Sequence, residues 1–560
     1  MSTLEQLDGL TPNDLGFDTA DFKSFRVNPS TGQQVQLEAI EFGVTCSKRF
    51  VGINAATGLG KTLIAASIAK LTGMRTVILT ATKGLQEQYK NSLGKYGLVD
   101  IRGRSNYECS DYGNLNCKSG ASLGCACVGG NGCTYERARD KARNALMVSA
   151  NYAYWMTAND KANGIERTNE EAIWKGKNPV ELLVCDEAHI APDWLESYLS
   201  TKIHQNDLKP YADIKHIGTD MKSWKDIAYR AVEDLNNKIG DEKIKLLKLG
   251  KHRVTPKMVS DLHTLESLQQ KYDRIAKAVS DDWVIELHEG TRYGRVWTFD
   301  VIWPGRYAEK YLFCGMPKVI LMSATLRPKT LGLLGISKEV SEFREWDRMF
   351  PANRNPIYSI PAKGVSGNEI RIDRHTNEND MLSWVEHIDT IIDGRLDRKG
   401  IIQTVSYQRQ GFLFAHSRHG NIMVGNTADP DSDTAIQVAE EFRKSPAPKI
   451  LVSPSFSMGW DFPRSECEYI IVAKIPFKPQ QSKVMKAREN RDKQYGAYMA
   501  MQELIQSCGR GMRSFDDRCE TIIVDGHLSW FLYANKSLAC SWFVNAVRKV
   551  NSIPTAPIKL

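Results

Sequence analysis

The stretch Ala55-Ala56-Thr57-Gly58-Leu59-Gly60-Lys61-Thr62 decides how the rest of this chain is interpreted. A short apolar run at 50–53 precedes it, and a helical apolar pattern at 63–69 follows it. A strand, a glycine-rich turn, Lys-Thr and a helix form the arrangement that binds a polyphosphate through inward-pointing backbone N–H groups. We therefore predict a nucleotide site in which Lys61 reaches the β- and γ-phosphates and Thr62 ligates Mg²⁺. The same loop contains the candidate binding residues Thr57, Gly58 and Gly60.

A second group of candidate catalytic residues follows another apolar run. Residues 181–185 are typical of a buried strand, and Asp186-Glu187-Ala188-His189 comes directly after them. Two carboxylates at the carboxyl end of a strand suit Mg²⁺–ATP hydrolysis, because one holds the metal and the next polarises the attacking water. Together with the glycine-rich loop, this pattern predicts an ATP hydrolase.

The composition is that of a globular protein with more than one domain. At 560 residues the chain is too long for a single core, so we expect two to four domains. It has no run of about 18 apolar residues, and its first residues, MSTLEQLDGL, lack the features of a signal peptide. We therefore expect a cytoplasmic protein with no membrane span. Lys and Arg (74) exceed Asp and Glu (66), and the net charge of +8 is compatible with a polyanionic partner.

Two series of apolar runs predict an α/β fold with two parallel-sheet domains. The first series is 50–53, 76–80, 145–152, 181–185 and 319–322, and the second is 400–404, 450–453, 469–473 and 521–525. We expect an N-terminal segment over 1–45, a first domain over 46–99, 141–190 and 314–330, and a second domain over 331–560. Residues 191–313 have a charged, helical pattern and predict an insertion whose last part, 291–313, returns to the sheet.

Five of the twelve cysteines lie within 25 residues of one another, in a segment that breaks the alternation of strands and helices. A segment like 100–140, with no apolar core of its own, needs a staple, and thiolate ligation supplies one in a reducing compartment. The candidate metal ligands are Cys109, Cys117, Cys125, Cys127 and Cys133.

A third group of candidate residues lies near the end of the chain. The stretch Gln506-Ser507-Cys508-Gly509-Arg510-Gly511-Met512-Arg513 follows a helical pattern at 495–505. Two arginines three residues apart on a helix lie on one face. Guanidinium groups presented to ATP from another domain stabilise charge on the γ-phosphate. We therefore predict that Arg510 and Arg513 reach the ATP site from the second domain.

The order of these motifs resembles that of superfamily 2 helicases, over about residues 50 to 525. The motifs are AATGLGKT (55–62), TATKGLQEQY (80–89), DEAH (186–189), SATL (323–326), SMGWDFP (457–463) and QSCGRGMR (506–513). Residues 102–109, 133–139 and 149–152 are similar to the cluster-domain motifs of the XPD/DinG branch, the iron–sulfur helicases. The resemblance implies two RecA-like motor domains, an iron–sulfur insertion at 100–140 and an arch-like helical insertion at 191–313.

The resemblance also implies a role for each matching residue. Asp186 holds Mg²⁺ together with Thr62, Glu187 is the catalytic base, and His189 couples the site to the second domain. The other implied roles are domain coupling by Ser323 and Thr325, contact with DNA and nucleotide by Gly459 and Asp461, completion of the ATP pocket by Gln506, Arg510 and Arg513, and an adenine contact by Gln36.

For the cysteines, the flanking motifs imply that Cys109 and Cys133 bind a 4Fe-4S cluster, with Cys117 as a further ligand. Because the two thiolates of a C-x-C pair are awkward ligands for one cluster, we expect either Cys125 or Cys127 to be the fourth. Structural zinc is the alternative.

The activity implied by the resemblance is ATP-dependent unwinding of DNA by 5′→3′ movement on one strand, with single-stranded and forked DNA as partners. Three alternatives stay open. They are a translocase that strips proteins from single strands and unwinds little, a nucleic-acid-binding module that ATP switches, and an RNA helicase of the DEAH type.

Overall fold

A computed structural model of the chain describes most of its residues. The described ranges are 9–29, 31–126, 132–162, 178–291, 294–348, 350–351, 353–426, 432–454, 462, 464–478, 482–512 and 517–556. The candidate site residues Cys127, Gly459, Asp461 and Arg513 lie outside these ranges. Within them, no helix combines the length and the apolar character that crossing a bilayer requires.

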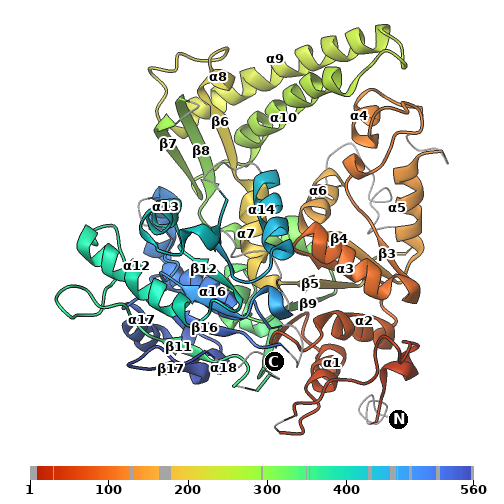
Figure 1. Cartoon of the computed structure of the whole chain (residues 1–560). Helices are drawn as coiled ribbons and strands as arrows, with labels where there is room; N and C mark the ends of the chain where they lie inside the picture. Colours follow the sequence, from red (N-terminus) through yellow and green to blue (C-terminus); the bar gives the residue numbers. More distant parts are fainter. Residues whose placement is uncertain are drawn as a thin grey trace.

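Two parallel seven-stranded sheets dominate the described part of the chain (Figure 1). The first sheet has the order β10-β1-β9-β5-β2-β4-β3. Its strands are β1 (Phe50–Ala55), β2 (Thr76–Thr80), β3 (Leu98–Asp100), β4 (Met147–Asn151), β5 (Leu182–Asp186), β9 (Lys318–Ser323) and β10 (Ser341–Trp346). The second sheet has the order β13-β14-β12-β15-β16-β11-β17. Its strands are β11 (Ile357–Ser359), β12 (Lys399–Gln403), β13 (Met423–Val424), β14 (Lys449–Ser453), β15 (Tyr469–Val472), β16 (Glu520–Ile523) and β17 (Val547–Lys549).

Helices cover both faces of each sheet, which is why the strands are apolar runs rather than alternating ones. One face of the first sheet packs against α1 (Val35–Thr45), α2 (Lys61–Thr72) and α3 (Lys83–Leu93). The other face packs against α6 (Tyr152–Ala162) and α7 (Ala191–Leu199). The second sheet packs on one face against α12 (Glu378–Asp393) and α13 (Tyr407–His416). Its other face packs against α14 (Ser432–Lys444), α16 (Tyr495–Cys508), α17 (Leu528–Asn535) and α18 (Ser541–Ala546). The predicted α/β class with two parallel-sheet domains is confirmed.

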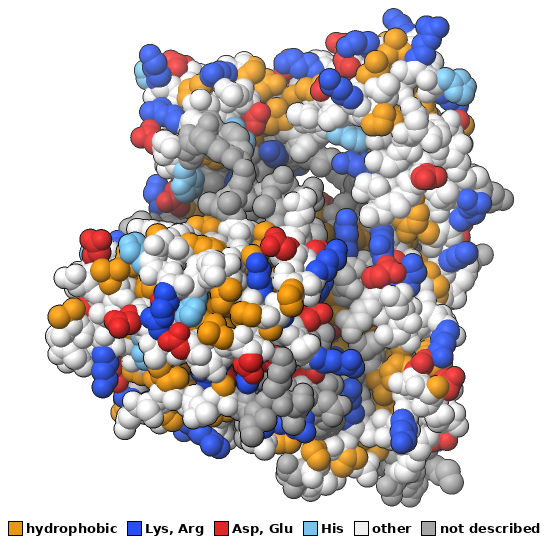
Figure 2. Space-filling model, viewed as in Figure 1, with side chains coloured by type: hydrophobic (Ala, Val, Ile, Leu, Met, Phe, Trp, Pro, Cys, Tyr) orange, Lys and Arg blue, Asp and Glu red, His pale blue; other side chains and the backbone are white. Residues whose placement is uncertain are grey.

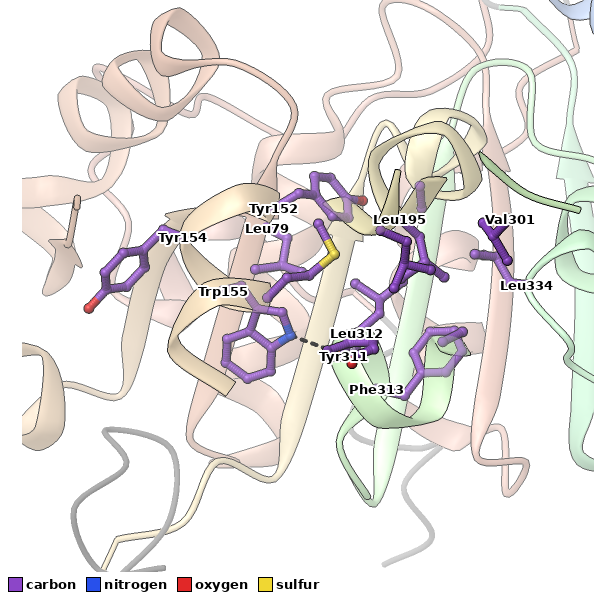
Figure 3. Packing of buried hydrophobic residues seen from close by; sticks show 14 of the residues in the cluster. Leu79, Tyr152, Tyr154, Trp155, Leu195, Val301, Tyr311, Leu312, Phe313 and Leu334 are labelled. Carbon is purple, nitrogen blue, oxygen red and sulfur yellow. Dashed lines mark hydrogen bonds between the residues drawn. The ribbon is translucent and has the colours of Figure 1, made fainter. Parts of the chain in front are cut away.

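The core behind the first sheet extends into the insertion that follows it (Figure 3). Trp155 of α6 is fully buried and its indole N–H donates to the carbonyl of Leu312, at 2.7 Å. Leu195 of α7 and Val301 belong to the same cluster. The insertion is therefore rooted in the first domain through one continuous apolar core.

The predicted boundary of the first domain at residue 330 is wrong. Strand β10 pairs with β1 in the first sheet, so this domain continues to Trp346. Its sequence, Ser-Glu-Phe-Arg-Glu-Trp, is largely polar because β10 is an edge strand, and no apolar run marks it.

The insertion is also organised differently from the prediction. Residues 291–313 do not return to the main sheet. Strands β6 (Thr201–His204), β7 (Trp283–Thr291) and β8 (Gly294–Val301) form a separate antiparallel sheet in the order β6-β8-β7. The tight β7–β8 hairpin favours local antiparallel pairing. We call residues 201–301 the arch; its helices are α8 (Gln205–Leu208), α9 (Met221–Lys248) and α10 (Pro256–Ala278).

The far end of the arch packs against the cysteine-rich segment, whose helices are α4 (Cys117–Ser122) and α5 (Thr134–Asn144). We call residues 104–144 the cysteine lobe. Lys251 Nζ lies 2.6 Å from Asp111 Oδ1, and the Asn114 side chain donates to the carbonyl of Val254 at 2.8 Å. Leu246 and Leu262 of the arch share an apolar cluster with Cys109, Tyr112, Leu115, Leu123 and Cys125 of the lobe. The arch lies at the top of the view in Figure 1, and its far end reaches the cysteine lobe near α4.

Candidate active site

The glycine-rich loop connects β1 to α2 at the carboxyl edge of the first sheet. Gly58 and Gly60 have φ of 88° and 77°, in the left-handed region that favours glycine. Helix α2 begins at Lys61, so the loop and the first turn of the helix present free N–H groups together, as an anion site requires. The geometry is that of the predicted phosphate-binding loop.

The N-terminal segment braces this loop from behind. The Gln36 side chain donates to the carbonyl oxygens of Leu59 and Gly60, at 2.9 and 3.2 Å, and its own oxygen accepts from the N–H of Arg26 at 2.8 Å. The Arg26 guanidinium donates to the carbonyl of Gly58. The structure thus assigns Gln36 a loop-bracing contact, and its contact with adenine remains a prediction. Sequence reasoning missed Arg26, because no local pattern links it to a loop some thirty residues away.

Asp186 lies at the end of β5 and is only 2% exposed. Its Oδ2 accepts a hydrogen bond from the Tyr89 hydroxyl at 2.9 Å, and its Oδ1 accepts from the N–H of Glu187 at 2.9 Å. Burial, and then the neighbouring charge of Glu187, raise the pKa of Asp186 to about 6, while Lys61 opposes this shift. A carboxylate that is buried at this edge without a full countercharge is suited to hold a divalent cation. Tyr89 belongs to the TATKGLQEQY motif, but its role was not predicted.

Glu187 is held in the left-handed region, with φ of 50°, which a non-glycine residue rarely adopts. Its carboxylate faces Lys61, with Nζ and Oε1 3.3 Å apart. The Ser323 hydroxyl donates to Glu187 Oε2 at 3.2 Å and lies 2.7 Å from His189 Nδ1. Strands β5 and β9 are neighbours in the sheet, so the DEAH and SATL motifs meet at the same edge.

The site continues into the second domain through Thr325 and Gln506. The N–H of Thr325 donates to the Ser323 hydroxyl at 3.3 Å, and the Gln506 amide donates to Thr325 Oγ1 at 2.8 Å. A Cβ built on Gly509 would lie 3.5 Å from Thr57 Oγ1 in the glycine-rich loop. The carboxyl end of α16 therefore lies directly against the nucleotide site of the first domain.

The prediction that Arg510 lies on a helix face is wrong. Helix α16 ends at Cys508, and Arg510 lies in the turn that follows, where it is 6% exposed. Gly509 is the C-cap residue, with φ of −92° and ψ of −3°, so the helix ends without a left-handed glycine. The turn still brings the backbone next to Arg510 within reach of the glycine-rich loop.

Four of the candidate cysteine ligands are described, and all four are buried and free of disulfides: Cys109, Cys117, Cys125 and Cys133. They form two pairs. In the first pair, Cys117 Sγ lies 3.7 Å from Cys133 Sγ. The second pair, Cys109 and Cys125, lies against Gly120, because a Cβ built on that glycine would overlap Cys109 Sγ and lie 3.5 Å from Cys125 Sγ. Burial raises the pKa of Cys117 to about 12. No three His, Cys, Asp or Glu side chains converge on a metal position within the described ranges. Four buried thiols fit a thiolate-bound group in their chemistry, although the two pairs do not form a closed site.

Known proteins resemble this chain in sequence and in fold. A family model described as helicase C-terminal domain matches residues 404–542, and one described as type III restriction enzyme, res subunit, matches residues 26–215. No curated protein matches the chain in sequence. A solved XPD helicase has a TM-score of 0.62 at 14% identity, with 92% of this chain and 98% of that chain covered. Xpd4 of S. tokodaii has a TM-score of 0.56 at 12% identity, with 92% and 100% covered.

These comparisons agree with the order of the motifs. The two family models match parts of both halves of the chain, and the likeness to the XPD structures extends over nearly the whole fold. The chain therefore has the fold of the solved XPD helicases, with two parallel-sheet domains, and a helicase C-terminal model matches part of its second domain.

Proposed function

We propose that this chain is a DNA helicase that hydrolyses ATP between its two domains, moves 5′→3′ on single-stranded DNA and unwinds the duplex ahead. The observation that carries the proposal is one continuous network. It leads from Lys61 and Glu187 through Ser323 and Thr325 to Gln506 of the second domain. A network that joins the hydrolytic carboxylate to the opposite domain is what conversion of hydrolysis into domain movement requires.

The first step assigned to the network is an exchange of partners by Lys61. In the structure, Lys61 pairs with Glu187. The γ-phosphate of ATP carries more negative charge than one carboxylate and takes the ammonium group. Glu187 is then free to accept a proton from the attacking water. In this proposal Asp186 and Thr62 hold Mg²⁺ against the phosphates, and Arg510 and Arg513 stabilise the charge that develops on them.

The second step transmits this change to the other domain. Ser323 bonds both Glu187 and His189, so a change of the Glu187 carboxylate alters the hydrogen bonds of that hydroxyl. The hydroxyl also accepts the N–H of Thr325, which in turn binds Gln506. Each hydrolysis event thereby changes the contact between the two domains.

We assign the arch and the cysteine lobe to the binding of nucleic acid. The face drawn in Figure 2 is hollowed between the arch and the motor domains, and Lys and Arg side chains lie at its margins. Cationic groups along a hollow bind the phosphates of a single strand without sequence preference. The cysteine lobe, braced by the arch, is assigned as the wedge at the incoming duplex, with Gly459 and Asp461 contacting DNA and nucleotide.

Steady-state ATP hydrolysis with and without nucleic acid tests this proposal. Single-stranded DNA is expected to raise the rate at least about tenfold, and single-stranded RNA of the same sequence to raise it much less. Stimulation by RNA alone would replace the proposal with an RNA helicase. Nucleic-acid binding that depends on ATP but occurs without turnover would replace it with a switched binding module.

The cysteines are proposed to hold a 4Fe-4S cluster, with zinc as the alternative. The holding residues are Cys109, Cys117, Cys133 and one of Cys125 and Cys127. The group, when bound, supplies a rigid covalent staple for a lobe with little apolar core. A cytoplasmic location, where thiols stay reduced, suits such a lobe.

Replacing Cys109 by Ser is expected to remove the metal. Protein purified without oxygen should contain about four iron atoms per chain, and Cys109→Ser should contain nearly none, because one thiolate of four is lost. Cys46→Ser, a cysteine far from the lobe in sequence, is the control and should keep its iron. Iron and zinc are measured per chain by mass spectrometry. Zinc without iron in the unaltered protein would contradict the cluster.

A further inference from the structure

Helix α16 presents one stripe of side chains to the first domain along its whole length. Tyr495, Tyr498, Gln502 and Gln506 are spaced by three or four residues and so lie on one face. The Tyr498 hydroxyl lies 2.5 Å from Thr330 Oγ1 of the first domain and accepts the Gln502 amide at 2.9 Å. Fourteen residues span about 21 Å. The helix is therefore a rod along the domain interface, with Gln506 at its carboxyl end in the ATP site.

The other end of this rod is held by Arg488, from the preceding helix α15 (Lys483–Arg491). The Arg488 guanidinium donates to the Tyr495 hydroxyl at 3.1 Å, and Tyr495 is the first residue of α16. Arg488 is 3% exposed. A buried guanidinium is costly unless its donors are used, and each of the three nitrogens of Arg488 donates at least one hydrogen bond.

The remaining partners of Arg488 belong to the first domain and its insertion. Its guanidinium donates to the carbonyl oxygens of Val301 and Ile302, at 2.8 and 2.9 Å, at the base of the arch. It also binds Glu196 Oε2 at 2.8 Å. Glu196 lies on α7, which follows the DEAH motif directly. Arg488 therefore joins the amino end of α16 to the helix that continues from the catalytic carboxylates.

We propose that Arg488 is a positioning residue for ATP hydrolysis: it fixes the amino end of α16 and thereby sets where Gln506 and Arg510 meet the nucleotide. The inference rests on the proposed ATPase function and adds a residue that lies outside the site itself. A helix is stiff over four turns, so a displacement at one end is carried to the other. A misplacement of about 1 Å in an active site costs about a hundredfold in rate.

A contact that only stabilises the fold would behave differently. Its loss would lower the melting temperature and the fraction of active protein, and its effect on the rate would be independent of Arg510. A residue that acts through Arg510 loses its effect once Arg510 is gone, because coupled residues are not additive.

The test is a double-mutant cycle with Arg488→Met and Arg510→Gln, read as kcat and KM for ATP with saturating single-stranded DNA. Arg488→Met is expected to lower kcat about tenfold or more and to change KM less than about threefold. Arg510→Gln is expected to lower kcat about a hundredfold or more. The double variant should be no slower than Arg510→Gln alone. Arg488→Lys keeps the charge but not the fork that binds two carbonyls, and should be intermediate.

Two further variants keep the test decisive. Lys549→Gln, on strand β17 of the second sheet, breaks an ion pair with Glu369 at a side chain that is 55% exposed, and should change neither constant. Glu196→Gln removes the negative charge that pairs with Arg488 without emptying buried space, and replaces Arg488→Met if that variant does not fold. Glu196→Gln should lower kcat less than Arg488→Met does, and only in protein that retains Arg510.

The outcomes separate the inference from the function on which it rests. If the unaltered protein hydrolyses no ATP, the proposed function fails and the inference fails with it. If the unaltered protein and Arg510→Gln behave as expected, but the losses from Arg488 and Arg510 multiply in the double variant, only the inference is overturned.

Discussion

Replacing Glu187 by Gln is expected to lower the rate of ATP hydrolysis about a thousandfold while ATP binding persists. The amide keeps the shape of the side chain and can still accept the Ser323 hydroxyl, but it cannot take a proton from water. Phosphate release measures the rate, and a fluorescent ATP analogue measures binding. Because the substitution also removes the carboxylate that pairs with Lys61, ATP binding is expected to become tighter rather than weaker.

Glu440→Gln is the matched control. It changes the same residue type on the surface of α14, where Glu440 pairs with Arg443, and should leave both measurements unchanged. A Glu187→Gln variant that retains turnover within tenfold of the unaltered protein would show that another group is the base.

Replacing Lys61 by Ala is expected to abolish ATP turnover together with ATP binding. Lys61 stands at the first position of α2 and is the one side chain of the loop that carries a positive charge to the β- and γ-phosphates. Its removal also leaves Glu187 without its partner, so the site becomes more negative and repels the nucleotide. Binding of the fluorescent analogue should weaken at least about tenfold, which distinguishes this variant from Glu187→Gln.

Lys549→Ala, on the second sheet, breaks a surface pair with Glu369 and is the control for loss of one lysine. An active Lys61→Ala variant would contradict the assignment of the glycine-rich loop as the phosphate site.

The local motifs predicted much of the fold and of the first half of the site. Buried parallel strands are short apolar runs, and β1, β2, β5 and β9 each coincide with one. The residues that follow such strands meet at one sheet edge, which is why Lys61, Glu187 and Ser323 could be grouped before their contacts were seen.

The elements that were missed lack a local signal. β10 is a polar edge strand, and its place in the first sheet depends on pairing with a strand almost 300 residues earlier. The sequence predicted Arg510 on a helix face, but α16 ends at Cys508 and Gly509 is its C-cap residue. Tyr89 and Arg488 act through contacts between distant segments, with Asp186 and with Glu196, and no spacing along the chain announces such contacts.

The cysteine lobe illustrates a different limit. The sequence predicted that four of five cysteines would hold one cluster. The four that are described are buried, but Cys117 and Cys133 belong to one apolar cluster and Cys109 and Cys125 to another. Their arrangement as two pairs depends on the packing of the lobe around Gly120 and against the arch. The number of cysteines in a segment does not predict how that segment packs.

Strand displacement on tailed duplexes tests the central claim, that ATP hydrolysis between the two domains drives unwinding of DNA. Duplexes with a 5′ single-stranded tail, a 3′ tail or a fork are mixed with the protein and ATP, and release of the labelled strand is followed over time. The labelled strand should be released from the 5′-tailed and forked substrates, with little release from the 3′-tailed substrate. The Lys61→Ala variant should release none. Turnover of ATP on the same DNA without release of any strand would contradict it and would indicate a translocase that acts on bound proteins.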